Sequence, residues 1–274
     1  MLFVHGATFP AGLASGYRFG DGTSWMDATV ASGCDAWALD FAGYGGSDRY
    51  PEMAGTTGEG PPLGRAPAAA AQIARAAEHV RRRSGAEKVS IVAHSWGTLA
   101  AARYACAYPA GVERLVLFGP IACRELGDDL QHLPAFHDVT LEEQYARFVD
   151  DVPEGHPPVL EDFERWSREY LATDTGPDKR DPPAVRIPGG PTADIMASWA
   201  GYFPYEPAGV RAQVLIVRGE WDSLCTDSDA AWLTARLTGA DGVRDVVIDR
   251  ATHLMHLETA RHELYAAATA FLNR

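Results

Sequence analysis

The sequence predicts an α/β fold with a mostly parallel central sheet flanked by helices. Short apolar runs rich in β-branched residues recur along the chain, as at residues 89–92, and suit strands buried on both faces. Segments with helix-forming composition alternate with these runs. Strands that alternate with helices are typical of parallel sheets, because a parallel crossover needs a long connection that is usually a helix.

The boundaries of several elements are marked by residues that begin or end helices. Residues 23–33 have Thr23 or Ser24 as a cap and Gly33 as a stop signal, and residues 67–84 begin at Pro67. Further helices are expected at 98–105, 226–238 and 257–272, and strands at 2–4, 35–40, 89–92, 112–119, 213–219 and 243–248.

The middle of the chain, residues 121–206, differs in character from its flanks. It holds 18 Asp and Glu against 7 Lys and Arg, whereas the whole chain has a net charge of −13. The strand–helix alternation stops there, and proline clusters separate the segments. We expect an inserted helical cap at 121–206 and a core made of 1–120 and 207–274. Helical patterns within the cap lie at 140–150, 160–172 and 192–203.

The composition argues against several classes of protein. A net charge of −13 disfavours nucleic acids and anionic membranes as partners. No apolar run approaches the roughly 20 residues of a membrane span, and the first residues lack the basic flank of a signal peptide. We expect a partner that is a small molecule with an apolar portion, and either a monomer or a homodimer.

The cysteines are scattered, without a C-x-x-C pair. They are expected to be free buried thiols in a reducing compartment, although their spacing also permits one disulfide. The expected location is therefore cytoplasmic, and no metal or other cofactor is expected. The four residues are Cys34, Cys106, Cys123 and Cys225.

The stretch from residue 88 to residue 97 carries the strongest chemical signal. A buried strand runs into Ala93-His94-Ser95-Trp96-Gly97, and a helix follows. A serine at the apex of a sharp strand–turn–helix is typical of the G-x-S-x-G nucleophile elbow, in which small residues let strand and helix pass closely. Ala93 stands in place of the first glycine. The alternative is a buried serine in an ordinary turn.

A serine hydroxyl needs a base, and the base needs an orienting carboxylate. We assign His253 as the base, because it follows the last strand and an imidazole exchanges protons near neutral pH. We assign Asp222, just past another strand, as the carboxylate. The alternatives are His256 for the base and Glu220 or Asp227 for the carboxylate.

The carboxyl ends of parallel strands meet at one edge of a sheet, where ligands bind. His5-Gly6-Ala7 also follows an apolar strand, so we expect it beside Ser95. The backbone N–H groups of Ala7 and Trp96 are the expected oxyanion-hole donors.

Five segments together resemble the α/β-hydrolase family, in its capped esterase, peptidase and C–C-hydrolase types. The resemblance implies Ser95, Asp222 and His253 as the catalytic triad and residues 121–206 as the lid. The segments are V-H-G-A at 4–7, D-F-A-G-Y-G-G-S at 40–47, A-H-S-W-G at 93–97, R-G-E-W-D at 218–222 and A-T-H-L-M-H-L-E at 251–258.

The chain departs from the family pattern at its start. The family has one or two antiparallel strands before V-H-G, and this sequence has none. Either the sequence is truncated there or the sheet lacks that edge, in which case the strand at 35–39 becomes the edge strand.

Aromatic residues recur at helical spacing in the cap. Most are expected to pack in the core, and a minority to line an apolar substrate pocket. His132, His137 and Asp138 lack a recognised metal-ligand frame, and Cys225 is expected to be a small buried apolar residue. The expected pocket residues are His5, His94, Phe136, Trp166, Trp199 and Phe203.

These patterns predict a cofactor-free serine hydrolase acting on a carboxylic ester, lactone or thioester. The same triad supports acyl transfer, C–C cleavage, lyase chemistry or cyclisation, and an amide hydrolase or a non-catalytic binding protein is a further alternative. The acidic cap suggests attraction of a cationic substrate.

Overall fold

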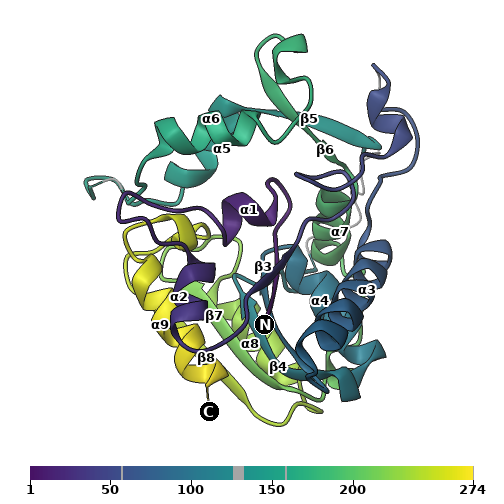
Figure 1. Cartoon of the computed structure of the whole chain (residues 1–274), viewed down its shortest axis with the longest axis vertical. Coiled ribbons are helices and arrows are strands. Elements are labelled where there is room, and N and C mark those ends of the chain that lie inside the picture. Colours follow the sequence, from purple (N-terminus) through teal and green to yellow (C-terminus); the bar gives the residue numbers. More distant parts are fainter. Residues whose placement is uncertain (57, 126–132, 158, 274) are drawn as a thin grey trace.

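A six-stranded sheet runs through the middle of the protein in the computed structural model, which describes residues 1–56, 58–125, 133–157 and 159–273 (Figure 1). The strand order is β2-β1-β3-β4-β7-β8, and every neighbouring pair is parallel. The predicted α/β class is therefore confirmed. The strands are β1 (Leu2–Val4), β2 (Trp37–Leu39), β3 (Val89–His94), β4 (Val112–Phe118), β7 (Gln213–Gly219) and β8 (Val243–Ile248).

Alternate residues of the central strands build two separate apolar clusters, one on each face of the sheet. Ile91 and Leu115 belong to one cluster, and their neighbours Val92 and Val116 belong to the other. Helices α3 (Ala66–Ser84), α4 (Gly97–Ala107) and α8 (Asp227–Arg236) contribute to the first cluster. Helices α2 (Trp25–Ala31) and α9 (Arg261–Leu272) contribute to the second. Burial on both faces explains why these strands are continuous apolar runs.

The strand predicted at 35–40 lies at one edge of this sheet as β2. It pairs with β1 through Trp37, Ala38 and Leu39, and no strand covers its other side within the described residues. The three residues are only partly buried or exposed, in contrast to the central strands. This placement agrees with the expected edge position.

The middle segment contains the three predicted helices and two strands that the sequence analysis missed. Helices α5 (Leu141–Val149) and α6 (Phe163–Leu171) lie above the sheet with the antiparallel pair β5 (Phe136–Thr140) and β6 (Ala184–Pro188) (Figure 1). Helix α7 (Gly190–Trp199) instead lies beside α3 and α4. The short helix α1 (Ala11–Ala14) lies beneath α6.

The remaining elements are single turns of 3₁₀ helix at Pro51–Ala54, Pro109–Gly111, Pro177–Lys179, Pro207–Gly209 and Met255–Leu257.

All four cysteines are free thiols. None of the helices described is long and apolar enough to cross a bilayer.

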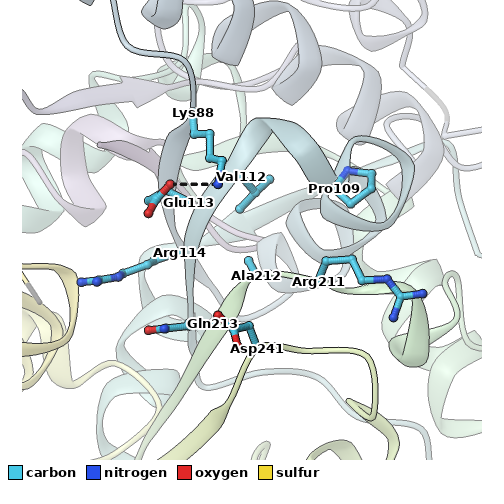
Figure 2. A pocket seen from close by; sticks show the side chains of 9 residues that line it. All are labelled: Lys88, Pro109, Val112, Glu113, Arg114, Arg211, Ala212, Gln213 and Asp241. Atoms are coloured by element: carbon cyan, nitrogen blue, oxygen red, sulfur yellow. Dashed lines mark ion pairs between the residues drawn. The ribbon is translucent and has the colours of Figure 1, made fainter.

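A polar hollow of about 210 Å³ lies at the amino ends of β3, β4 and β7 (Figure 2). Lys88 and Glu113 form an ion pair of 3.3 Å at its rim. Because Ser95, Asp222 and His253 follow the carboxyl ends of strands, this hollow lies at the opposite edge of the sheet from them.

Candidate active site

Ser95 occupies a sharp turn between β3 and α4. Its φ of 53° is left-handed, a strained conformation for a residue with a side chain. Its N–H donates to the carbonyl of Phe118 at 2.9 Å, which ties the turn to β4. A Cβ at Gly97 would lie 2.3 Å from the carbonyl oxygen of His5, so the helix passes the neighbouring strand too closely for any other residue. This is the geometry of a nucleophile elbow.

His253 and Asp222 form a buried pair. Nδ1 of His253 lies 2.9 Å from both carboxylate oxygens of Asp222, and the two residues are 2% and 3% exposed. The N–H groups of Leu224 and Cys225 also donate to Oδ1 of Asp222, each at 2.9 Å. Since Nδ1 is the donor in this pair, Nε2 of a neutral His253 is an acceptor. Nε2 is buried and has no hydrogen-bond partner among the described residues.

The alternative residues are not part of this pair. Glu220 accepts from the N–H of Arg250 at 2.8 Å, and Asp227 pairs with Arg218 at 2.6 Å on the surface. Burial lowers the pKa of His256 to about 3, so its ring is neutral at ordinary pH. None of the three is hydrogen-bonded to the His253–Asp222 pair.

Two sets of contacts join the residues next to Ser95 to the His253–Asp222 pair. Phe118, which accepts from Ser95, is followed by Gly119, where a Cβ would lie 2.9 Å from Cε1 of His253. His94, the neighbour of Ser95, contacts the His253 carbonyl through Nε2 at 3.0 Å. The Ser95 hydroxyl itself forms no hydrogen bond to His253 in this structure, although such contacts often tighten only when substrate binds.

The segment after β1 lies next to the serine. A Cβ at Gly6 would lie 3.1 Å from Cβ of Ser95, so a glycine allows this approach. Among the described residues, no backbone carbonyl accepts from the N–H groups of Ala7 or Trp96. Tyr44 holds the segment by donating to the Ala7 carbonyl at 2.6 Å. Two unused donors beside a serine are what an oxyanion hole requires.

Two of the expected pocket residues, His5 and His94, make hydrogen bonds and ring contacts beside the site. His5 accepts from the N–H of Phe41 at 3.1 Å through Nε2 and contacts the Gly6 carbonyl through Nδ1 at 2.8 Å. Burial lowers its pKa to about 4, so it remains neutral. His94 stacks on Phe118 with ring centroids 4.4 Å apart.

The four aromatic residues expected in the pocket lie in different places. Trp166 packs against Phe9 at 5.2 Å and donates to the Leu13 carbonyl at 3.4 Å, close to the segment that follows β1. The others lie under or beside different partners: Phe136 under Arg186, Trp199 under Arg124, and Phe203 between Tyr205 and Trp232.

The sequence analysis missed Asp194, which connects α7 to the elbow. Its carboxylate accepts from Nε1 of Trp96 at 2.9 Å, from the N–H of Ala66 at 2.6 Å, and from the Arg65 guanidinium. Asp194 is 2% exposed, so its contacts with Trp96 and Ala66 are protected from water, whereas the Arg65 side chain is 45% exposed. No sequence signal marks it, because its partners are about 100 or more residues away along the chain.

The described residues contain no group of three or more His, Cys, Asp or Glu side chains that could hold an ion. His132, which the sequence analysis considered, lies outside the described residues.

Comparisons with known proteins identify the family and the fold. A sequence profile of the alpha/beta hydrolase family matches residues 1–268, and the chain belongs to that family. No curated protein matches the sequence.

Several solved structures share the fold. One is the thioesterase domain from the curacin biosynthetic pathway, with 16% identity, a TM-score of 0.65, and coverage of 100% of this chain and 90% of that one. A monoacylglycerol lipase from Paleococcus ferrophilus has 18% identity, a TM-score of 0.63, and coverage of 99% and 92%. A meta-cleavage product hydrolase from Pseudomonas fluorescens IP01 has 16% identity, a TM-score of 0.63, and coverage of 99% and 89%.

Replacing Asp194 by Ala should lower the free energy of unfolding by about 2–4 kcal/mol, because it leaves a buried indole N–H and a guanidinium without their acceptor. Urea denaturation measures this change. The exposed Asp178→Ala in the same segment is the control and should change stability little. A loss for Asp194→Ala no larger than the control's would contradict the assignment.

Glu258 gives a pH-dependent prediction. It is fully buried and accepts from Thr252, and burial raises its pKa from 4.5 to about 7. The folded protein therefore favours the neutral acid, and this stabilisation is lost as the pH rises from about 4.5 through about 7. Relative to wild type, Glu258→Gln should gain on the order of 3 kcal/mol in unfolding free energy between pH 5 and pH 8.

Urea denaturation at the two pH values measures this gain. The exposed Glu263→Gln is the control, and its difference from wild type should be the same at both pH values. If Glu258→Gln also showed no pH-dependent difference, Glu258 would be ionised normally in the folded protein.

Proposed function

We propose that the protein is a cofactor-free serine hydrolase that cleaves a carboxylic ester, lactone or thioester through an acyl-enzyme on Ser95. The observation that carries this proposal is the His253–Asp222 pair, with Nδ1 at 2.9 Å from both carboxylate oxygens and Nε2 left unpaired. An imidazole held in this tautomer is prepared to accept a proton from a nearby hydroxyl. The strained elbow at Ser95 supplies that hydroxyl.

The reaction proceeds in two halves. Oγ of Ser95 attacks the carbonyl carbon while Nε2 of His253 takes the hydroxyl proton. Asp222 stabilises the resulting imidazolium, and the N–H groups of Ala7 and Trp96 stabilise the oxyanion. The intermediate collapses to the acyl-enzyme, and His253 gives its proton to the leaving alcohol or thiol. Water then attacks the acyl-enzyme by the same steps and releases the acid.

The elements above the sheet would act as a lid. Ser95 and His253 are each 2% exposed, so the site is covered in this structure. Trp166 and Leu13 connect α6 to α1, close to the proposed oxyanion donors. A lid that excludes water strengthens the electrostatic interactions at the reacting carbonyl. Its opening would admit the substrate.

Ser95→Ala should abolish labelling by a fluorophosphonate probe and lower the kcat for p-nitrophenyl acetate and butyrate by about 10⁴-fold or more, because the nucleophile is gone. Gel fluorescence and release of p-nitrophenolate measure the two effects. Ser84→Ala, an exposed serine at the end of α3, is the matched control and should behave as wild type.

Labelling that persists in Ser95→Ala would assign the nucleophile elsewhere. Well-folded wild-type protein that neither labels nor turns over either ester would contradict the hydrolase proposal.

A further inference from the structure

Two helices above the sheet carry polar side chains with buried, unpaired atoms. Gln144 and Arg147 lie one turn apart on α5, and Tyr170 lies on α6. Gln144 and Tyr170 are 0% exposed. Among the described residues, neither amide atom of Gln144, nor Nε of Arg147, nor the hydroxyl of Tyr170 has a hydrogen-bond partner.

The guanidinium of Arg147 differs from those of the neighbouring arginines in its ion pairing. No carboxylate of the described residues lies within 4 Å of it, whereas Arg165, Arg168, Arg180 and Arg186 all have such partners. Burial lowers the pKa of Arg147, and the neighbouring Tyr170 and Asp151 act in the opposite direction. Buried polar groups in native proteins are almost always paired, so a group of unpaired ones indicates a partner that binds from outside the chain.

Contacts connect the two helices that carry these side chains to the segments around the proposed catalytic residues. At the end of α5, Asp151 accepts from the N–H of Ser223, the neighbour of Asp222, at 3.2 Å. On α6, Tyr170 stacks on Trp166 at 5.2 Å, and Trp166 contacts Phe9 in the segment after β1. Figure 1 shows α5 and α6 above α1, over the carboxyl ends of the strands.

We propose that Arg147, Gln144 and Tyr170 bind a carboxylate on the substrate of Ser95, an inference that rests on the proposed function and specifies its substrate class. The guanidinium, the amide nitrogen and the phenol are donors, and Gln144 Oε1 is the one side-chain acceptor that cannot also donate. A planar guanidinium matches a carboxylate geometrically, and one positive charge matches one negative charge.

The same donors disfavour the cationic substrate that the acidic composition suggested. The acidic residues of α5, Glu142 and Glu143, are exposed to solvent, which screens their charge, whereas Gln144 and Tyr170 are buried. A polyanion is disfavoured too, because a single guanidinium would leave its further charges unpaired.

Two esters of equal chain length test the proposal. p-Nitrophenyl hemiglutarate carries a carboxylate where p-nitrophenyl valerate has a terminal methyl group. In wild type, kcat/KM should favour the hemiglutarate, and Arg147→Met should lower that ratio by about 100-fold while sparing the valerate. Tyr170→Phe should lower the ratio by about 5- to 10-fold. Arg168→Met, an exposed arginine on α6, is the matched control and should leave the ratio unchanged.

Binding provides a readout that needs no turnover. Monomethyl glutarate should bind Ser95→Ala in calorimetry, and adding Arg147→Met should weaken its Kd by about 100-fold. If this holds but no ester is hydrolysed by wild type, the carboxylate site stands and the hydrolase proposal fails.

Thermal unfolding separates binding from structural support. Because Arg147→Met removes a buried charge with no partner, the melting temperature should stay the same or rise. If the melting temperature fell by several degrees while the ratio of the two esters stayed constant, Arg147 would be structural and the proposal would be wrong. Equal turnover of the two esters in wild type, unaltered in Arg147→Met, would also overturn it and leave the hydrolase proposal intact.

Discussion

The contact between His253 and Asp222 is the interaction on which the rest of the site depends. Two loops that follow different strands of the sheet bring these side chains together, and backbone donors from Leu224 and Cys225 hold the carboxylate in place. The fit leaves little room, because a Cβ at Gly119 would lie 3.1 Å from Asp222. Because Nδ1 is the donor to Asp222, Nε2 is the nitrogen of His253 that can accept a proton. The packing at this edge of the sheet therefore decides which ring nitrogen is available as a base.

The elements above the sheet contribute to stability, and the proposed carboxylate site would give them a part in specificity. They are held to the core by polar contacts between distant segments. Asp194 binds Trp96 and Arg65, and Arg49 donates to the carbonyls of Gly43, Thr173 and Arg186. The polar groups in these contacts are paired, whereas the side-chain polar atoms of Gln144 and Tyr170 are buried and have no partner among the residues that the structure describes. Unpaired buried polar groups lower the stability of a folded protein. Functional sites commonly contain such groups, because stability there is balanced against function.

The sequence predicted what local patterns encode. The strands of the sheet, the strand–turn–helix around Ser95 and the helices of the middle segment follow from apolar periodicity and turn residues, and the structure contains them. The edge position of residues 35–39 was expected instead from the resemblance, for the case in which the family's first strands are missing from the sheet. The antiparallel pair of β5 and β6 was missed because its two strands are far apart in sequence and the segment was read as helices separated by proline clusters. Asp194 and Arg147 were missed because their roles depend on residues far away in sequence. Phe203 was expected in the substrate pocket, but helical spacing does not say which surface a side chain meets, and Phe203 packs on Trp232.

The most direct test of the account is the imidazole proton shared between His253 and Asp222. Proton nuclear magnetic resonance of the Ser95→Ala protein should show a low-field signal from Nδ1–H, because the group is buried, hydrogen-bonded and protected from exchange. The signal should disappear in Asp222→Asn, where the carboxylate is replaced, and remain in the surface variant Asp227→Asn. If the low-field signal were absent from the Ser95→Ala protein, or unchanged in Asp222→Asn, the pair would not exist as described and His253 would lack the orientation that the proposed chemistry requires.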